Sequence, residues 1–257
     1  MSEKKYEVPL HKIGKLAIIE SIANAIDKDL IDFKSENKLV TYNSIHMLKW
    51  DFTNTNLVNK FENTEFTCYV AKRGAWRFIL LYDKINKILY TLMRRERFEQ
   101  IQSNEKTDKV HYIESLVSPN KELSVPDQLK RSFQGDLFDM NGEGREEKLQ
   151  EVFNDLTQNL GPIEKYVLIT FESDKNMLTS VSALLLTSKL EIAYEEDWSD
   201  LIPASYDSDE GANESQETYE DGFEEIELPI RDKSVPKEDE AEPFIRKNDG
   251  EKKGEDS

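Results

Sequence analysis

The residues best equipped for chemistry in this sequence are basic. Eight lysines and arginines fall within a short stretch that also contains tryptophan and tyrosine, namely Lys72, Arg73, Arg77, Lys84, Lys87, Arg94, Arg95 and Arg97. Basic side chains neutralise phosphates and exposed aromatic rings stack on unpaired bases, so this stretch is a candidate surface for nucleic acid or for a protein partner. The more common explanation is structural, because lysine and arginine also protect turns and strand edges.

The sequence contains no recognisable catalytic or metal-binding pattern. Cys68 has no second cysteine with which to bind zinc, and its place in an apolar strand pattern predicts a buried structural residue rather than a nucleophile. His111 and Glu114 lie three residues apart on a predicted helix and could share a cation, although such a pair is more often an ordinary exposed face. A metal nuclease would need carboxylates on adjacent strands, but Asp83 falls in a predicted turn. We therefore expect no catalytic residue, cofactor or metal.

The basic residues are expected on a sheet. The alternating pattern of Phe66–Phe98 predicts three antiparallel strands followed by a helix. Trp76 is expected to be a buried core residue in a central strand that is apolar on both faces. Gly74 is expected in the first turn, and Asn86 is expected to be the left-handed residue of the second. A second meander is predicted later in the chain, at Tyr166–Phe171, Leu178–Leu186 and Leu190–Tyr194.

Helices are predicted where apolar residues recur every three to four positions. The predicted segments are His11–Lys28, Ser44–Phe61, Asp108–Val117, Pro126–Phe133 and Arg145–Leu160. The sequence thus indicates an α+β fold with two antiparallel β-meanders covered by helices. Residues 1–203 are expected to form a single domain, in which residues 1–9 are loose.

Residues 204–257 are expected to form a disordered acidic tail, because their apolar residues are too sparse to bury a core. The chain has a net charge of −18, and from residue 195 to the end there are 23 acidic and 7 basic residues. One group of apolar residues among glutamates is a candidate docking motif, namely Phe223, Ile226, Leu228 and Ile230. A solvating tail with incidental hydrophobic residues is the more usual explanation.

The composition also bears on location. A single cysteine forms no internal disulfide, which fits a reducing compartment. No apolar run reaches the roughly 18 residues that span a bilayer, and the first residues contain no apolar signal-peptide core. We expect a cytoplasmic protein that does not associate with membranes.

Several short stretches carry a resemblance to a known family. They are Lys49–Leu57, Lys72–Trp76, Leu89–Arg94, Arg97–Phe98, and Leu190–Tyr194 with Trp198. Together they resemble an uncharacterised family of bacterial and prophage-associated proteins, a domain of unknown function. The resemblance covers most of residues 10–203 and none of the tail. It implies a bacterial cytoplasmic setting on a mobile element, and it brings no activity, ligand or catalytic residue with it.

Two hypotheses about function remain open. The first is a non-enzymatic interaction or regulatory protein, which contacts an unidentified protein partner through the tail or the basic residues. The alternative is a nucleic-acid-binding protein, a nuclease or toxin, whose basic face is screened by the acidic tail. A basic surface that encloses a carboxylate cluster would favour the alternative, and a basic surface without convergent acids would favour the first hypothesis.

Overall fold

A computed structural model of the chain describes residues 6–38, 40–41, 43–103, 110–123, 142–174 and 176–203. The predicted acidic tail and the predicted helix Pro126–Phe133 lie outside the described residues. Within the segment that was expected to be loose, Val8 is buried against the core. At least this part of the N-terminal segment is therefore packed.

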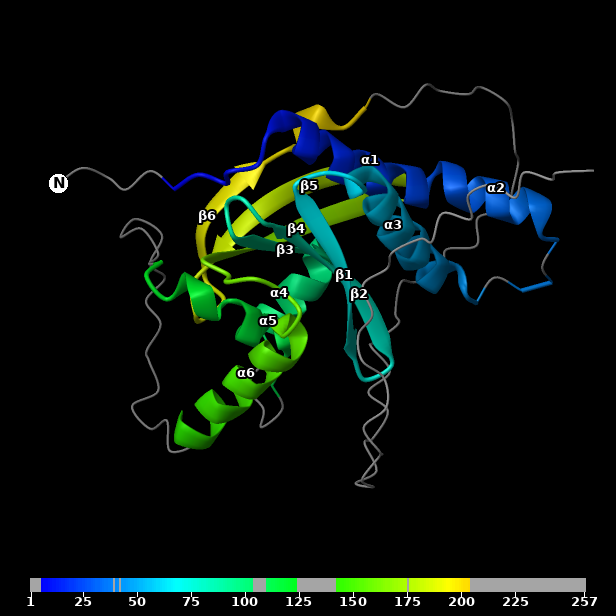
Figure 1. The fold of residues 1–257 in the computed structure, drawn as a ribbon. Helices are drawn as coiled ribbons and strands as arrows, with labels where there is room; N and C mark the ends of the chain where they lie inside the picture. The colour runs from blue at the N-terminus through cyan, green and yellow to red at the C-terminus, as the bar shows by residue number, and fades with distance from the viewer. Residues whose placement is uncertain are drawn as a thin grey trace, which may run out of the picture.

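A six-stranded mixed sheet forms the centre of the fold (Figure 1). Its strands lie side by side in chain order: β1 (Phe66–Arg73), β2 (Trp76–Asp83), β3 (Ile88–Arg94), β4 (Lys165–Asp174), β5 (Met177–Leu186) and β6 (Ile192–Asp197). Strands β1–β3 and β4–β6 are the two predicted antiparallel meanders, and a parallel pairing of β3 with β4 joins them. The α+β prediction is confirmed, whereas the sequence did not indicate the parallel junction.

The two central strands are buried on both faces, which is why their sequences are apolar almost throughout. In β4, Val167 and Ile169 belong to one core cluster, and Tyr166 and Leu168 belong to the other. All four side chains have no exposed surface. The sheet thus separates two apolar cores, and each core requires a covering layer of helices.

The helices supply those layers in two groups (Figure 1). One face is covered by α1 (Lys12–Ile26) and α3 (Ile45–Phe61), against which α2 (Lys28–Glu36) packs, and the other by α4 (Arg95–Ser103), α5 (Tyr112–Leu116) and α6 (Gly142–Thr157). Ile18 of α1 and Leu57 of α3 are buried in the first core, and Phe98 of α4 and Ile113 of α5 in the second. Two short 3-10 helices, η1 (Ser118–Asn120) and η3 (Ser199–Leu201), complete the described elements.

The turns of the first meander follow the expected chemistry with one exception. Gly74 has a φ of 60°, as the tight turn between β1 and β2 requires. In the next turn, Lys87 and not Asn86 has positive φ, at 55°, so that prediction is wrong. The reason is the buried carboxylate of Asp83, which accepts hydrogen bonds from the backbone N–H groups of Ile85 and Asn86 and from the Asn86 side chain.

Strands β2 and β3 diverge toward the turn between β1 and β2. Their register covers only Leu81–Asp83 against Ile88–Tyr90, whereas β1 and β2 pair along their whole length. Trp76 lies at the diverging end and is partly buried, so the expectation of full burial is wrong. Its ring packs edge-on against Trp50 of α3, with ring centroids 5.7 Å apart.

Candidate functional site

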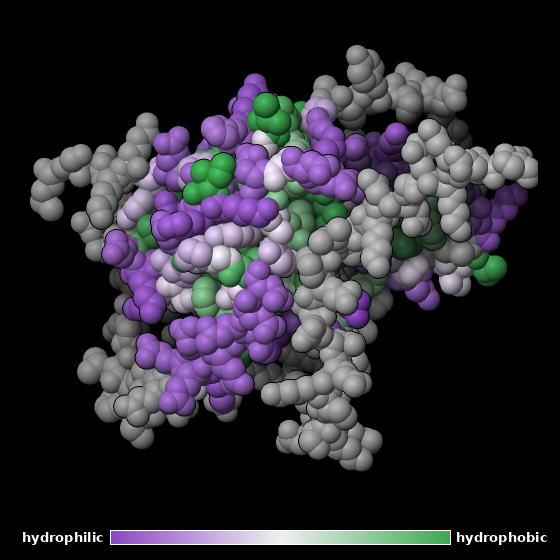
Figure 2. Space-filling view, in the orientation of Figure 1, coloured by the Kyte–Doolittle hydropathy of each residue, from purple (hydrophilic) through white to green (hydrophobic). Residues whose placement is uncertain are grey.

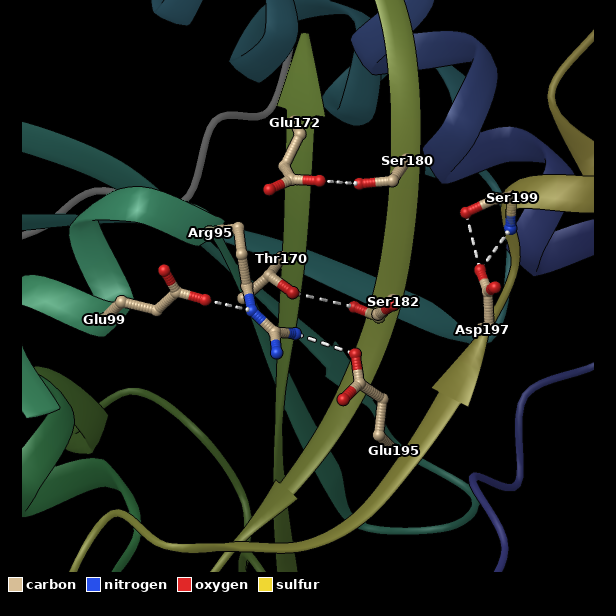
Figure 3. A pocket seen from close by; sticks show the side chains of 9 residues that line it. All are labelled: Arg95, Glu99, Thr170, Glu172, Ser180, Ser182, Glu195, Asp197 and Ser199. Atoms are coloured by element: carbon tan, nitrogen blue, oxygen red, sulfur yellow. Dashed lines mark hydrogen bonds and ion pairs between the residues drawn. The ribbon is translucent and has the colours of Figure 1, made fainter.

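A polar pocket of about 290 Å³ lies on the sheet face that carries α4 to α6 (Figure 3). Strands β4, β5 and β6 form its floor, and the first turns of α4 form one wall. The described lining residues are Arg95, Glu99, Thr170, Glu172, Ser180, Ser182, Glu195, Asp197 and Ser199. The lining is therefore made of carboxylates and hydroxyls around a single guanidinium.

The charged groups of this pocket are hydrogen-bonded to one another or to neighbouring serines (Figure 3). Arg95 donates to Glu99 at 3.0 Å and to Glu195 at 2.7 Å. Asp197 accepts from the backbone N–H and the hydroxyl of Ser199, and these hydrogen bonds lower the pKa of its carboxyl. The described lining has serine and threonine hydroxyls but no cysteine, histidine or lysine, so no imidazole or amine stands beside these hydroxyls as a general base.

A second candidate site lies on the opposite face, where α3 passes the ends of β3 and β4. Arg94, the last residue of β3, pairs with Phe171 of β4. The Phe171 ring packs against Trp50, with centroids 5.6 Å apart, and Trp50 follows Lys49 on α3. Helix α2 approaches the same part of α3 through a ring contact between Phe33 and Phe52 at 6.0 Å. These contacts bring together four residues that we call the cationic cluster: Lys34, His46, Lys49 and Arg94.

The members of the cationic cluster affect one another electrostatically. Burial lowers the pKa of Lys49, and the nearby charges of Arg94 and Lys34 lower it further. The pKa of His46 is lowered by burial and then by Lys49 and Arg94. Arg94 is itself partly desolvated, which lowers its pKa, while the charge of Glu96 opposes this effect. Partly buried groups of like charge repel one another, so an anion bound among them would be stabilised.

The start of α3 adds to this positive potential. The N-terminus of a helix carries a partial positive charge that an acidic residue or a capping side chain usually offsets. In α3, the N-cap residue Ser44 makes no side-chain capping bond, and the first turn contains no acidic residue. Lys49 instead places further positive charge near this end of the helix, whereas the lowered pKa of His46 favours its neutral form. The helix end and the cationic cluster therefore favour the same kind of ligand.

The structure distributes the eight predicted basic residues over several places. Lys72, Arg73 and Arg77 are exposed beside the turn that connects β1 to β2. The register places Lys72 and Arg77 on one face of the hairpin and Arg73 on the other. Lys84 and Lys87 lie in the turn at the opposite end of β2, where Lys87 is paired with Glu164 at 2.6 Å. These five residues do not form one continuous surface.

The remaining three basic residues separate in the same way. Arg95 belongs to the polar pocket, Arg94 belongs to the cationic cluster, and Arg97 lies near His111 on the other face of the sheet. Sequence reasoning missed Lys34 and Lys49, because they lie on helices that precede the sheet. Only the fold brings them next to Arg94, and no local pattern could have revealed this.

His111 and Glu114, which the sequence suggested could share a cation, form a capping box at the start of α5. Nδ1 of His111 accepts a hydrogen bond from the Ile113 backbone N–H at 3.3 Å, and Glu114 accepts one from the His111 backbone N–H at 2.9 Å. Glu114 is also paired with Arg145 of α6. These groups thus fix the start of α5 and link it to α6, and both side chains are partly buried rather than fully exposed.

Neither the thiol of Cys68 nor the metal-ligating side chains among the described residues form a reactive site. Cys68 is partly buried, and burial raises the pKa of its thiol to about 12, so the thiolate nucleophile is not available near neutral pH. Across the residues that the structure describes, no three His, Cys, Asp or Glu side chains converge in a way that could hold a metal ion. In the same ranges, no helix combines the length and apolar character that crossing a membrane requires.

The visible surface gives a further constraint on partners. Figure 2 shows a face that is largely hydrophilic, with apolar side chains gathered in small, separate patches. Such a face does not resemble the broad apolar interface of an obligate complex. The predicted docking residues Phe223, Ile226, Leu228 and Ile230 lie outside the described residues.

Together these features define an α+β protein in which one mixed sheet separates two helical layers, with a polar pocket on one face and a cationic cluster on the other. The chain belongs to the DUF5986 family, a family of unknown function, whose family model matches residues 5–247. The resemblance to an uncharacterised family is confirmed. The expectation that it excludes the tail is wrong, since the match includes most of residues 204–257. Neither the curated proteins nor the solved structures gave a match to the chain.

Proposed function

We propose that the chain is a non-enzymatic interaction protein that binds an acidic polypeptide segment of a partner through the cationic cluster. The observation that supports this proposal is the approach of Lys34 and Arg94 to Lys49 near the start of α3, where burial lowers the pKa of Lys49 and the charges of Arg94 and Lys34 lower it further. Carboxylates that bind there would relieve the repulsion among the cations. The polar pocket is a poor competitor for this role, because its described lining has four carboxylates and one guanidinium and would repel an acidic ligand.

Single-stranded nucleic acid is the second candidate ligand, and a specific observation favours it. Trp50 and Trp76 are both partly buried and lie in edge-on contact next to the cationic cluster. Indole rings beside basic groups can stack on bases while the cations contact phosphates. A protein ligand is preferred, because each of these two rings already packs on protein groups, Trp50 on Phe171 and Trp76 on the second core cluster.

The proposal also includes a setting, which is the cytoplasm of a bacterium, with a prophage or another mobile element as the source. The single cysteine, which can form no internal disulfide, supports a reducing compartment. The bacterial and mobile-element context is supported by the sequence resemblance alone.

A charge-neutralising variant tests the proposed surface. The full chain carrying Lys34→Gln and Lys49→Gln is compared with a control carrying Lys84→Gln and Lys121→Gln, which removes the same charge from exposed positions. Binding of fluorescent poly-glutamate and of oligo-dT is measured by anisotropy over a range of salt concentrations. Exposed ion pairs contribute about 0.2–1 kcal/mol each, so we expect the loss of two lysines to weaken the binding of poly-glutamate by about twofold to thirtyfold.

Three results would discriminate between the hypotheses. Tighter binding of oligo-dT than of poly-glutamate, lost in the cluster variant, would favour nucleic acid as the ligand. Equal weakening in the cluster variant and the control would show a non-specific charge effect and refute the surface. Absence of poly-glutamate binding to the parent chain at low salt would refute the preference for acidic polypeptides.

A further inference from the structure

We infer that two copies of the chain associate through β1, whose open edges pair in antiparallel orientation about a two-fold axis at Tyr69. The inference goes beyond the proposed function and does not depend on it. It is carried by the backbone groups at the edge of β1, by the charges at the two ends of this strand, and by the contrast with the other edge of the sheet.

Strand β1 forms one edge of the sheet, and half of its backbone groups face away from β2. The Lys84 N–H donates to the Glu65 carbonyl at 3.4 Å, next to the pair of Phe66 with Asp83. Because hydrogen-bonded and non-hydrogen-bonded pairs alternate in an antiparallel ladder, Glu65 and every second residue after it bond to β2. The residues between them direct their N–H and C=O groups to the open edge, namely Phe66, Cys68, Val70 and Lys72.

This edge is available over most of its length. Among the described residues, no backbone hydrogen bond reaches the edge-facing groups of Cys68, Val70 or Lys72. The Phe66 N–H donates to the Thr64 hydroxyl at 3.2 Å, which closes one end of the edge. Helix α3 covers a face of β1 and not its edge, since its contacts are with the side chains of the first core cluster. Unpaired groups of this kind form a template for another strand.

The sequence of β1 is complementary to itself in antiparallel orientation. If Tyr69 faces Tyr69 of a second copy, then Cys68 lies opposite Val70 and their edge-facing groups meet. The same register places Glu65 of each copy opposite Arg73 of the other. Both residues are exposed, and neither forms an ion pair with another described residue. Opposite charges across a pair of strands stabilise the pairing, so each dimer gains two such contacts.

The charges also select one register. Since the edge-facing groups recur at every second residue, only shifts of two residues keep the ladder intact. Such a shift places Ala71 or Ala75 opposite Glu65 and loses both ion pairs. Pairing about a two-fold axis uses the open edge of both copies at once, so the assembly closes at two chains.

The other edge of the sheet is unsuited to the same association. Strand β6 ends in three consecutive acidic residues, Glu195, Glu196 and Asp197, and charged residues oppose pairing at an edge. In β1, by contrast, residues Thr67–Ala71 carry no charge. The edge of β1 is therefore the one that fits a second copy of this chain.

Sedimentation equilibrium of the full chain over a range of concentrations tests the inference. A contact of one strand from each copy is small, so we expect a dimer in equilibrium with the monomer. Arg73→Glu turns both ion pairs into like-charge contacts and should raise the dissociation constant about fourfold or more. Reversal at both positions, Glu65→Arg with Arg73→Glu, should restore the dissociation constant of the parent. The control is Arg77→Glu, an equal charge change at an exposed position of β2, which should leave dimerisation unchanged.

A cysteine placed on the two-fold axis tests the register. In a Cys68→Ser background, Tyr69→Cys brings two thiols together in a non-hydrogen-bonded pair, where Cα atoms about 4.5 Å apart allow a disulfide. Oxidation should then give a covalent dimer on a non-reducing gel. The matched control in the same background is Thr67→Cys, whose two copies lie about 13 Å apart along the strands and should not be linked.

Several results would overturn the inference. The full chain would remain monomeric at every concentration if another part of its own sequence occupied the edge. A dimer that Arg73→Glu leaves unchanged, or that reversal at both positions does not restore, would exclude the Glu65–Arg73 pairing. Disulfide formation through Thr67→Cys as readily as through Tyr69→Cys would exclude the register. None of these variants changes Lys34 or Lys49, so such a failure would leave the proposed function standing.

Discussion

His111 should make the stability of the fold decrease at acid pH. Burial lowers the pKa of its imidazole to about 4, and the nearby charges of Arg97 and Arg73 act in the same direction. The neutral ring accepts the Ile113 N–H through Nδ1, so protonation at this atom removes the capping hydrogen bond of α5. Two effects, the burial of a charge and the loss of a cap, thus oppose protonation of His111 in the folded state.

The sign and the size of the effect follow from linkage. Since the folded pKa lies below the value of about 6.5 for an unperturbed histidine, the unfolded chain binds more protons between these two pH values. Stability is fully present above pH 6.5 and is lost as the pH falls toward 4. Between pH 7 and pH 5, a shift to a pKa of about 4 removes about 2 kcal/mol from the free energy of unfolding.

Replacement by asparagine isolates this contribution. The amide oxygen of asparagine can accept the same capping hydrogen bond, but the side chain does not titrate. Urea unfolding at pH 7 and pH 5 is measured for the parent chain and for His111→Asn, so that other titrating groups cancel in the comparison. The loss between the two pH values should be about 2 kcal/mol smaller in the variant. Equal losses in both proteins, or an NMR titration of the His111 ring centred near 6.5, would refute the reasoning.

Three further predictions concern stability, reactivity and domain boundaries. Asn120→Leu should destabilise the fold by about 3 kcal/mol in urea unfolding, because it removes three buried hydrogen bonds to the backbones of Tyr166 and Leu186; an unchanged midpoint would contradict this. Cys68 should react with a thiol reagent at pH 8 only after denaturation, given its pKa of about 12, and rapid labelling of the native chain would disprove its burial. Limited proteolysis should first cut beyond Pro203, and initial cleavage inside β4 or β5 would refute this domain boundary.

The strands were predictable from sequence because their burial follows directly from alternation. In β2, Phe78, Leu80 and Tyr82 lie in one core while Ile79 and Leu81 lie in the other, as the pattern requires. The pairing of β3 with β4 was not predictable, since about 70 residues separate the two strands in the chain and both are apolar on each face. Strands with two apolar faces specify that they are central, but not which neighbour they pair with.

The partial burial of Trp76 shows a second limit. Its position in the alternating pattern is the same as that of Phe78, yet it lies where β2 has separated from β3. Whether a strand keeps its neighbour along its whole length depends on tertiary packing, and in this protein Trp50 packs against Trp76 at the diverging end. Alternation identifies the face of a residue, while the extent of pairing decides how much of that residue is covered.

The candidate site could be predicted only in part, for a related physical reason. Proximity in sequence grouped Arg94 with Arg95 and Arg97, but a strand end followed by a helix points these side chains toward different surroundings. Arg95 pairs with Glu99 and Glu195, whereas the charge of Arg94 acts on Lys49 and His46 and lowers the pKa of both. The functional meaning of a basic residue therefore depends on which charges the fold places beside it. At Arg95 these charges belong to two carboxylates that accept its hydrogen bonds, and near Arg94 they include the ammonium of Lys49, whose pKa the charge of Arg94 lowers.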